Sequence, residues 1–251
     1  MKILDKINFF YIFIFKLSLL GCNAMTELIP VLDLMSGIAV SGKSGKRDTY
    51  KPLETIYSKT PDPVQIAIAL KRQGFKRIYI ADLDAIGGKG TNLEVVRQVN
   101  HVLPVMLDWG VKYVKSFEFA LNYAQKIIIA TETLTSFKDL EEIFNKYPKE
   151  RITVSIDVKD GQILSNSIST TFNEIKSKLL ELKPQEIILL DISHVGTLKG
   201  YNQDILNEFS GMEDRLILGG GINPDEIKNL LNHGVSKFLV GTALHNGEIG
   251  Y

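Results

Sequence analysis

Cysteine is almost absent from this sequence, which limits the chemistry that it can carry. The 251 residues include one cysteine, Cys22, and four histidines, and no Cys/His cluster has the spacing of zinc ligands. A single cysteine cannot form an internal disulfide, which favours a reducing compartment. The sequence therefore predicts no metal site and no cofactor, and we expect a cytoplasmic protein.

An excess of charge of either sign is also lacking. Lys+Arg and Asp+Glu number 29 each, so the formal net charge is zero. Without a global positive field, we expect no nucleic-acid partner and no attraction to an anionic membrane, and any anion must be bound locally. The apolar content of 45% is sufficient for a sizeable core. A chain of this length is compatible with a single α/β barrel domain.

No apolar run is long enough to span a bilayer. Residues 7–22 form an apolar run that Lys16 interrupts, and it is shorter than the roughly 20 apolar residues that a membrane helix needs. Because Met25 precedes the first predicted strand, we interpret residues 1–24 as an apolar extension with a mis-assigned start, and residues 25–251 as the barrel domain. Two alternatives stay open: a secretory signal ending near Cys22, and a helix over residues 3–21 that packs on the barrel.

Short β-branched runs alternate with longer amphipathic stretches from Leu28 onward, which is typical of βα units around a parallel sheet. One such stretch, residues 63–74, has Pro63 in its first turn and Gly74 at its end, as a helix would. Eight strands predict a closed (β/α)8 TIM barrel, with an open doubly wound sheet as the alternative. The predicted strands are residues 29–34, 77–82, 104–108, 126–130, 151–157, 186–191, 215–219 and 237–241.

An internal repeat indicates that the barrel consists of two similar halves. LDWGVK at 107–112, followed by IIIATETL at 127–134, matches LGGGIN at 218–223, followed by FLVGTAL at 238–244. Each pair has the same spacing, because residues 108 and 130 lie 22 apart, as do residues 219 and 241. Such self-similarity is the pattern of a duplicated supersecondary unit. The sequence ends shortly after the eighth predicted strand, which predicts a short or missing eighth helix.

Glycines cluster at the ends of the last two predicted strands. Gly219, Gly220 and Gly221 precede an Asn-Pro-Asp helix start, and Gly241 and Thr242 follow the final strand. Turns without side chains let backbone N–H groups face an anion, and in TIM barrels a phosphate often binds at these strand ends. A single glycine would more often serve only a tight turn. The two groups together predict a phosphate site.

Carboxylates also stand where strands end. Asp33 follows the first strand and Asp157 the fifth, which are opposite positions in an eight-stranded barrel. Such a pair could divide acid and base roles across one substrate, although an aspartate at a strand end also often caps the next loop. We interpret Asp33 and Asp157 as catalytic candidates. Three further strand-end carboxylates are candidates for orienting the substrate or for a structural role, namely Asp82, Asp84 and Asp191.

A glycine-rich basic loop, residues 42–48, follows the first strand. It carries three positive charges, among them Lys43, and could close over an anionic ligand, although a solvated surface loop has a similar composition. Its GKSGKR sequence lacks the spacing of a Walker A phosphate loop. His194, near Asp191, is a further candidate for contact with the substrate because histidine is a residue type that can exchange a proton near neutral pH, but a lone histidine is more often structural.

These features together resemble the phosphoribosyl barrels of histidine biosynthesis, which are the ribotide isomerase and the cyclase subunit of imidazole glycerol phosphate synthase. The resemblance runs from Leu28 to Ile249 and is carried by IPVLDL, ADLDAIGGKGTN, SIDV, DISHVGTLKG and, most specifically, LGGGIN with FLVGTAL. It implies a sugar-phosphate ligand and an aldose-to-ketose rearrangement. It also implies Asp33 as general base and Asp157 as general acid.

Several positions depart from the family pattern. Asp108 and Trp109 replace glycines of a second phosphate cradle, and Ala130, Thr131 and Glu132 replace its Gly-Ser/Thr partner. Carboxylates repel phosphate, so we expect one phosphate site and a cationic or aromatic far end of the substrate that these residues meet. Further departures are Leu190, Val195 and Ser41. Since the family lysine or arginine is absent at Ser41, we expect no glutaminase partner.

The sequence thus predicts an isomerase-type proton-transfer enzyme that acts on a phosphorylated, phosphoribosyl-like small molecule. The chain resembles a diverged branch of the family known from methanogens and methylotrophs. Two alternatives remain: a non-catalytic barrel that binds a phosphorylated metabolite, and a genuine isomerase of the histidine pathway. The oligomeric state stays open.

Overall fold

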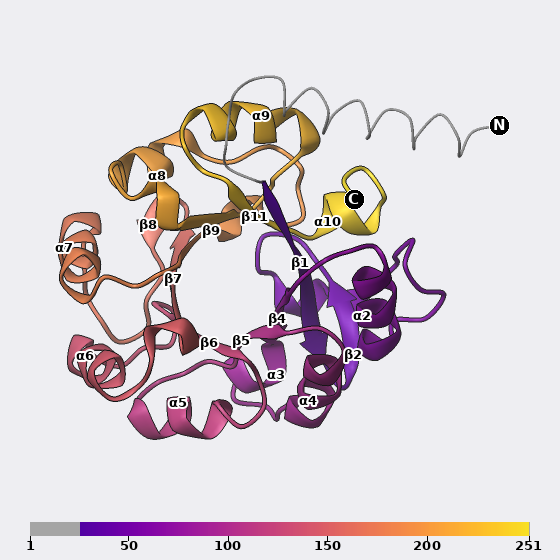
Figure 1. The fold of residues 1–251 in the computed structure, drawn as a ribbon, viewed down its shortest axis with the longest axis horizontal. Coiled ribbons are helices and arrows are strands. Elements are labelled where there is room, and N and C mark those ends of the chain that lie inside the picture. Colours follow the sequence, from indigo (N-terminus) through magenta and orange to yellow (C-terminus); the bar gives the residue numbers. More distant parts are fainter. Residues whose placement is uncertain (1–25, 251) are drawn as a thin grey trace.

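Eight parallel strands form a closed barrel in the computed structural model, which describes residues 26–250 (Figure 1). Each strand pairs with its neighbour along the chain, and β11 pairs with β1, which closes the sheet. The predicted TIM barrel is confirmed, and the alternative of an open sheet is wrong because of this last pairing. The barrel strands are β1 (Glu27–Met35), β4 (Ile78–Asp82), β5 (Val105–Asp108), β6 (Lys126–Ala130), β7 (Ile152–Lys159), β9 (Ile187–Asp191), β10 (Leu216–Gly219) and β11 (Lys237–Val240).

In the described part of the chain, seven longer helices surround the barrel. Asp62 caps the first of them, with Pro63 in its first turn, and Asn223 and Pro224 begin the last in the same way. Among residues 26–250, the eighth position holds the four-residue α10 (Thr242–His245), which confirms the predicted short eighth helix. The longer helices are α2 (Pro63–Arg72), α4 (Leu93–Val102), α5 (Val114–Ala120), α6 (Phe137–Lys146), α7 (Phe172–Leu182), α8 (Gln203–Glu208) and α9 (Pro224–Asn232), and the short α3 spans Leu83–Ile86.

Two hairpins that the sequence analysis did not predict mark the start of each half-barrel. The first turn has Ser36 and Gly37 at φ 52° and 82°, and the second has Asp160 and Gly161 at φ 52° and 75°. Two successive positive φ angles fit the tight turns that match strand twist. The hairpins add β2 (Ile38–Ser41), β3 (Lys51–Pro52) and β8 (Gln162–Ile163), and single 3-10 turns lie at Arg47–Thr49, Lys149–Arg151, Ile192–His194 and Glu213–Arg215.

The core has two parts, as expected for a sheet that is buried on both faces. Strand residues that point outward, for example Leu32 and Ile80, pack against helix residues such as Phe117. Residues that point inward fill the barrel itself. These include Ile29, Tyr79, Met106, Ile128, Ile188, Ile217 and Leu239.

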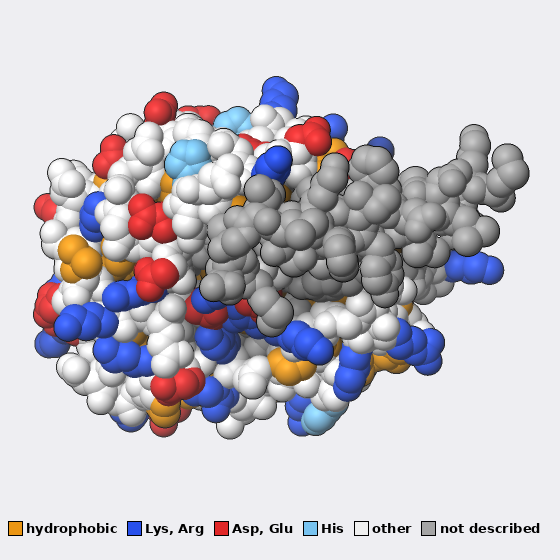
Figure 2. Space-filling view, turned by 45° about the horizontal axis from the view of Figure 1, so that its top comes forward, with side chains coloured by type: hydrophobic (Ala, Val, Ile, Leu, Met, Phe, Trp, Pro, Cys, Tyr) orange, Lys and Arg blue, Asp and Glu red, His pale blue; other side chains and the backbone are white. Residues whose placement is uncertain are grey.

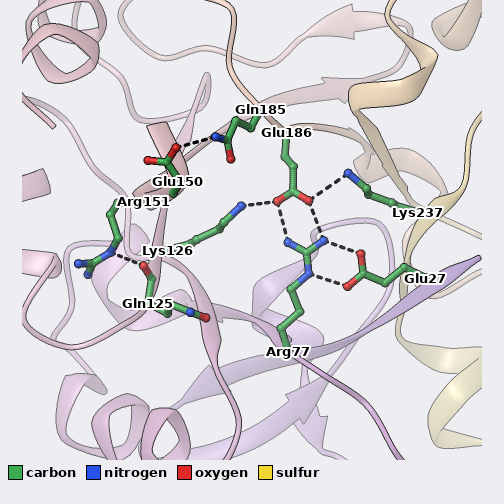
Figure 3. Close-up of polar contacts among 9 residues, drawn as sticks. All are labelled: Glu27, Arg77, Gln125, Lys126, Glu150, Arg151, Gln185, Glu186 and Lys237. Atoms are coloured by element: carbon green, nitrogen blue, oxygen red, sulfur yellow. Dashed lines mark hydrogen bonds and ion pairs between the residues drawn. The ribbon is translucent and has the colours of Figure 1, made fainter. Parts of the chain in front are cut away.

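An ion-pair network lies at the end of the barrel where the strands begin (Figure 3). Arg77 donates to both Glu27 and Glu186, and Lys126 and Lys237 also donate to Glu186. Burial alone would raise the pKa of Glu186, but the hydrogen bonds and charges of Arg77 and Lys126 hold it well below its usual range. This network, called the basal cluster below, lies at the amino ends of the strands, opposite the carboxyl ends where the predicted site residues stand.

The surface carries both charge signs, consistent with the balanced composition. Figure 2 shows Lys and Arg side chains interspersed with Asp and Glu over the visible face. Within residues 26–250, no helix has the length and apolar character needed to cross a membrane. The alternatives for residues 1–24 concern a segment outside the described residues.

Candidate active site

A cavity of about 590 Å³ opens at the carboxyl ends of the barrel strands. Asp33, Asp108 and Asp157 line it from three different strands, as the barrel geometry predicts. It also brings together other predicted site residues, namely Lys43, Glu132, Gly220, Gly221, Gly241 and Thr242. The remaining candidates do not line this cavity: Gly219, Asp82, Asp84, Trp109, Asp191 and His194.

Asp33 and Asp157 lie on opposite sides of the cavity, because β1 and β7 are four strands apart in the closed barrel. The side chain of Asp33 has no hydrogen-bond partner among residues 26–250, so both of its oxygens are available to a ligand. Burial raises the pKa of Asp33 to about 6, and the positive charge of Arg47 opposes this rise. The group is therefore mostly ionised at neutral pH.

Asp157 is 2% exposed and is held by two neighbouring hydroxyls. Ser155 Oγ donates to Asp157 Oδ1 at 2.7 Å, and the backbone N–H of Asp157 donates to Thr131 Oγ1 at 3.0 Å. Burial and then the negative charge of Asp108 raise the pKa of Asp157 to about 7, while the Ser155 hydroxyl lowers it. A large share of this carboxyl is therefore protonated at neutral pH.

The third buried carboxyl, Asp108, ends β5. It accepts hydrogen bonds from the Gly110 N–H at 3.1 Å and from the Tyr79 hydroxyl at 3.4 Å. Burial raises its pKa to about 7, although the Gly110 N–H lowers it. Glu132, which follows β6, pairs with Arg47 at 3.2 Å. This end of the cavity, where the internal repeat would place a second phosphate cradle, is acidic.

Trp109 points away from this acidic end. Its indole Nε1 donates to Thr91 Oγ1 at 2.9 Å, and its ring packs against Phe119, with centroids 5.5 Å apart. The predicted contact between Trp109 and a substrate remains a prediction.

The glycines of the predicted phosphate cradle differ in what the fold requires of them. Gly220 and Gly221 have φ of +106° and +74°, and a Cβ on Gly220 would lie 2.2 Å from the Asp191 carbonyl oxygen. Gly219 is also tightly packed, since a Cβ there would lie 2.9 Å from the Leu190 side chain. Gly241 is different, because a Cβ there would meet nothing closer than Val31 at 3.9 Å. Packing does not demand glycine at 241, but a bare backbone there leaves the cavity open for a ligand.

His245 holds the short helix α10 against β1. Its Nε2 lies 2.9 Å from the Val31 carbonyl oxygen, so this nitrogen carries the proton, and its Nδ1 lies 3.0 Å from Thr55 Oγ1. Burial lowers its pKa, which favours the neutral ring. Because α10 begins at Thr242, these contacts fix one wall of the predicted phosphate cradle to the strand that carries Asp33.

Asp82 and Asp84 organise the loop after β4. Asp82 accepts from the Asn92 N–H at 2.6 Å and caps α3, and Asp84 accepts from the Ser36 N–H at 2.6 Å. The Asn92 side-chain oxygen Oδ1 also accepts a hydrogen bond from the Gly37 N–H at 2.7 Å. Their observed partners are therefore loop and turn groups, which fits the structural alternative that was left open for them.

Asp191 and His194 form a close pair beside the predicted cradle. Asp191 Oδ2 lies 2.5 Å from His194 Nδ1, and Asp191 Oδ1 accepts the Ser193 N–H at 3.1 Å. A Cβ on Gly221 would lie 3.0 Å from the Cβ of His194. The pair thus supports the glycine turn from outside the cavity.

The basic loop, residues 42–48, lies across the cavity and is called the lid loop below. Ser44 forms two hydrogen bonds to the loop after β9. Its backbone N–H donates to the Val195 carbonyl oxygen at 3.0 Å, and its hydroxyl donates to the Ser193 carbonyl oxygen at 2.9 Å. Arg47 reaches the other side to pair with Glu132. The departures Ser41, Leu190 and Val195 all line the same cavity.

Sequence reasoning did not single out several polar residues of the site. Ser155 and Tyr79 share the inward face with Asp157 and Ala81, and strand alternation alone could have placed them there. Arg47 was recognised only as one charge of the lid loop, since no local pattern indicates its long-range pairing with Glu132. Within residues 26–250, no group of His, Cys, Asp and Glu is arranged to hold a metal ion.

Comparisons with known proteins agree with this architecture. An uncharacterized protein of Methanocaldococcus jannaschii is 38% identical over 228 residues, which cover 89% of this chain and 95% of that protein. Two relatives are named 1-(5-phosphoribosyl)-5-((5-phosphoribosylamino)methylideneamino)imidazole-4-carboxamide isomerase. The one from Desulforudis audaxviator is 30% identical, with 88% of this chain and 87% of that protein covered, and the one from Cenarchaeum symbiosum is 28% identical, with 89% and 96% covered.

The family model described as histidine biosynthesis protein matches residues 27–250, which is nearly the whole barrel. The resemblance found in the strand-end motifs is thereby confirmed. This chain belongs to the histidine biosynthesis protein family.

Proposed function

We propose that the protein is an isomerase that transfers protons within a phosphorylated, phosphoribosyl-like substrate, with Asp33 as general base and Asp157 as general acid. The observation that carries this proposal is the opposed placement of these two carboxyls in one cavity, with pKa values of about 6 and about 7. Two titratable groups with different proton affinities can divide base and acid roles near neutral pH.

The reaction class is an aldose-to-ketose rearrangement of an N-glycosyl compound. Asp157 donates a proton to the ring oxygen, and the ring opens to an iminium ion. Asp33 then removes the proton from C2, which gives an enolamine. The protonated Asp33 exchanges its proton with water and delivers one to C1, while the C2 hydroxyl returns a proton to Asp157 and becomes a ketone. No atom is gained or lost, and the proton that Asp157 gave up is recovered from the C2 hydroxyl. The names of several relatives support this reaction class, because they describe isomerases of a phosphoribosylamino compound.

A single phosphate is proposed to bind at Gly220, Gly221, Gly241 and Thr242. Open space at Gly241 and the N–H groups of the glycine turn support this position. At the symmetry-related end, Asp108 and Glu132 would oppose a second phosphate. We propose that the far end of the substrate is instead cationic or aromatic and meets Asp108 and Glu132.

A second candidate is the isomerase of the histidine pathway itself. The name of that activity contains two phosphoribosyl groups, so its substrate has two phosphates to place. The identity of 30% over 237 residues to such an isomerase favours this candidate. Lys43 and Arg47 in the cavity wall are the cations that could compensate for the missing cradle.

Substrate conversion separates these candidates. The purified protein and its Asp33→Asn and Asp157→Asn variants would be incubated with the two-phosphate ribotide and with simpler N-(5-phosphoribosyl)amines, and ketose formation followed by NMR. Conversion of the single-phosphate compounds alone supports the proposal, and efficient conversion of the ribotide supports the histidine-pathway candidate. Conversion of neither, with phosphate-ester binding that both variants retain, would identify a non-catalytic binding barrel.

The phosphate site has its own test. Gly241→Ala has room for its new Cβ, because the nearest atom lies 3.9 Å away, but the backbone at φ −103° and ψ −96° lies outside the regions that residues with a Cβ prefer, so its fold is verified by circular dichroism and its Tm. It should nevertheless weaken inorganic phosphate binding, measured by calorimetry. The matched control is Gly87→Ala, at a glycine with φ −80° that ends α3 and does not line the cavity. Unchanged phosphate affinity in Gly241→Ala would remove the proposed cradle.

A further inference from the structure

Ser155 and Asp157 lie two residues apart on the inward face of β7, and their side chains are in contact. Ser155 Oγ lies 2.7 Å from Asp157 Oδ1. Ser155 is 1% exposed, so water does not compete for its hydroxyl. A contact this short between a hydroxyl and a carboxyl oxygen is typical of a strong hydrogen bond.

The direction of this hydrogen bond follows from the surroundings of Ser155. A serine hydroxyl has one hydrogen to donate, and a buried hydroxyl without an acceptor is costly. Within residues 26–250, the only hydrogen-bond partner of Ser155 Oγ is Asp157 Oδ1. Thr153, the next residue on the same face of β7, does not take the proton, because its Oγ1 has no partner. Ser155 therefore donates to Asp157 Oδ1.

This direction distinguishes the two oxygens of Asp157. If Oδ1 carried a proton, its hydrogen and that of Ser155 would compete for the same contact, and one of them would be left buried without an acceptor. Oδ1 is thus the acceptor in either charge state. The acidic proton belongs on Oδ2.

We infer that Ser155 is a positioning residue that fixes Oδ2 as the proton-carrying oxygen of Asp157. This inference rests on the proposed role of Asp157 as general acid. By holding Oδ1, the hydroxyl also limits rotation of the carboxyl group, so the proton is presented in one orientation. Rotational order of this kind is what a positioned acid needs in order to reach a fixed substrate atom.

Ser155→Ala tests the inference through the titration of Asp157 itself. The protein labelled with ¹³C at aspartate carboxyl groups would be titrated by NMR, with the Asp157 signal assigned by its loss in Asp157→Asn. A hydrogen bond to the charged form lowers a pKa, so its removal should move the Asp157 midpoint upward by about one pH unit. The variant Ser155→Thr, which keeps the hydroxyl, should retain the wild-type midpoint.

Thr153→Val is the matched control, since it removes an unpartnered hydroxyl from the same face of the same strand. It should leave the Asp157 midpoint unchanged. If Ser155→Ala does not fold, Ser155→Cys replaces the hydroxyl with a weaker donor of similar size and should also raise the midpoint. An unmoved midpoint in the folded Ala or Cys variant, or an equal rise in Thr153→Val, would overturn the inference.

The kinetic readout separates this inference from the proposed function. In an active enzyme, Ser155→Ala should lower kcat more than it raises KM and should move the alkaline limb of the rate profile upward with the Asp157 midpoint. A full wild-type rate in Asp157→Asn would refute the proposed acid. The titration would still decide the contact between Ser155 and Asp157, because it needs no substrate.

Discussion

Arg47 and Glu132 form an ion pair at 3.2 Å across the mouth of the barrel. Arg47 belongs to the lid loop, which begins after β2, whereas Glu132 follows β6 on another side of the cavity. Together with the bonds from Ser44 to the loop after β9, this pair ties residues 44–47 of the lid loop to two sides of the cavity. The same guanidinium lowers the pKa of Asp33 against the effect of burial, so lid position and base strength are linked.

Glu132→Gln should loosen the lid loop without unfolding the barrel. The side chains of the pair are 33% and 19% exposed, so solvent screens their attraction and the loss of stability should be about 1 kcal/mol or less. Hydrogen exchange at residues 43–48 should accelerate, because the lid loop loses one of its anchors. The control is Glu94→Gln, which breaks the exposed Arg97–Glu94 pair on α4. Equal exchange at the lid loop in wild type and Glu132→Gln would contradict this role.

The reaction rate should have a narrow, bell-shaped dependence on pH. Activity requires ionised Asp33, so it should fall as the pH drops below the Asp33 pKa of about 6. It also requires protonated Asp157, so it should fall as the pH rises above that pKa of about 7. The profile of kcat/KM on the free enzyme measures both limbs. A rate that rises steadily to pH 9 would exclude Asp157 as the acid.

Asp108→Asn should stabilise the protein at alkaline pH and lower the pKa of Asp157. The folded-state pKa of Asp108 is raised to about 7, so its contribution to stability is present at low pH and is lost as the pH rises through that value. The neutral amide avoids this loss, and a rise of about three pKa units corresponds to about 4 kcal/mol at pH 8, or roughly 8–16 °C in Tm. Little gain should appear at pH 4.

Thermal melts at the two pH values measure this difference. The pKa of Asp157 should fall for a separate reason. Removal of the Asp108 charge relieves the repulsion that raises the Asp157 pKa. A Tm gain that is the same at pH 4 and pH 8 would show that packing, rather than charge, is responsible.

Glu186→Gln should destabilise the barrel strongly. Glu186 is the shared acceptor of Arg77, Lys126 and Lys237, and its loss leaves these partly buried cations with too little negative charge. Breaking a buried pair in this way costs about 3–5 kcal/mol. The folded-state pKa of Glu186 is depressed, so its contribution is present above its unfolded pKa and is lost only as the pH falls into the acid range.

Urea unfolding at pH 7 measures this cost. Glu150→Gln is the control, since Glu150 is an exposed residue near the basal cluster that bonds only to Gln185 among the contacts drawn in Figure 3. We expect Glu150→Gln to stay within about 0.5 kcal/mol of wild type. A comparable loss of unfolding free energy in both variants would show that the basal cluster contributes no more to stability than an exposed carboxylate.

The barrel could be predicted from the sequence because its signals are local. All eight strands were placed within a few residues, as at 126–130, where the apolar run KIIIA corresponds to β6. The hairpins were missed because β3 and β8 have two residues each and form only by pairing with a neighbouring strand. The turns at Ser36-Gly37 and Asp160-Gly161 were the signals that could have indicated them.

The candidate site was predictable where function depends on strand ends and not where it depends on tertiary contacts. Asp33, Asp157 and Gly241 were placed on the cavity by strand position alone. The pairing of Arg47 with Glu132 joins residues 85 positions apart, and no local pattern specifies it. Asp82, whose bonds go to Asn92 and the α3 cap, shows that a strand-end carboxylate can equally serve a loop.

Deuterium incorporation is the most direct test of the central claim that Asp33 and Asp157 carry out proton transfer on a phosphoribosyl-like substrate. In D₂O, the wild-type protein should convert an N-(5-phosphoribosyl)amine to the ketose with deuterium at C1, detected by NMR or mass spectrometry. Asp33→Asn and Asp157→Asn should each slow this incorporation by about 10²-fold or more. Wild-type protein that forms no ketose, or Asn variants that form it at the wild-type rate, would contradict the account.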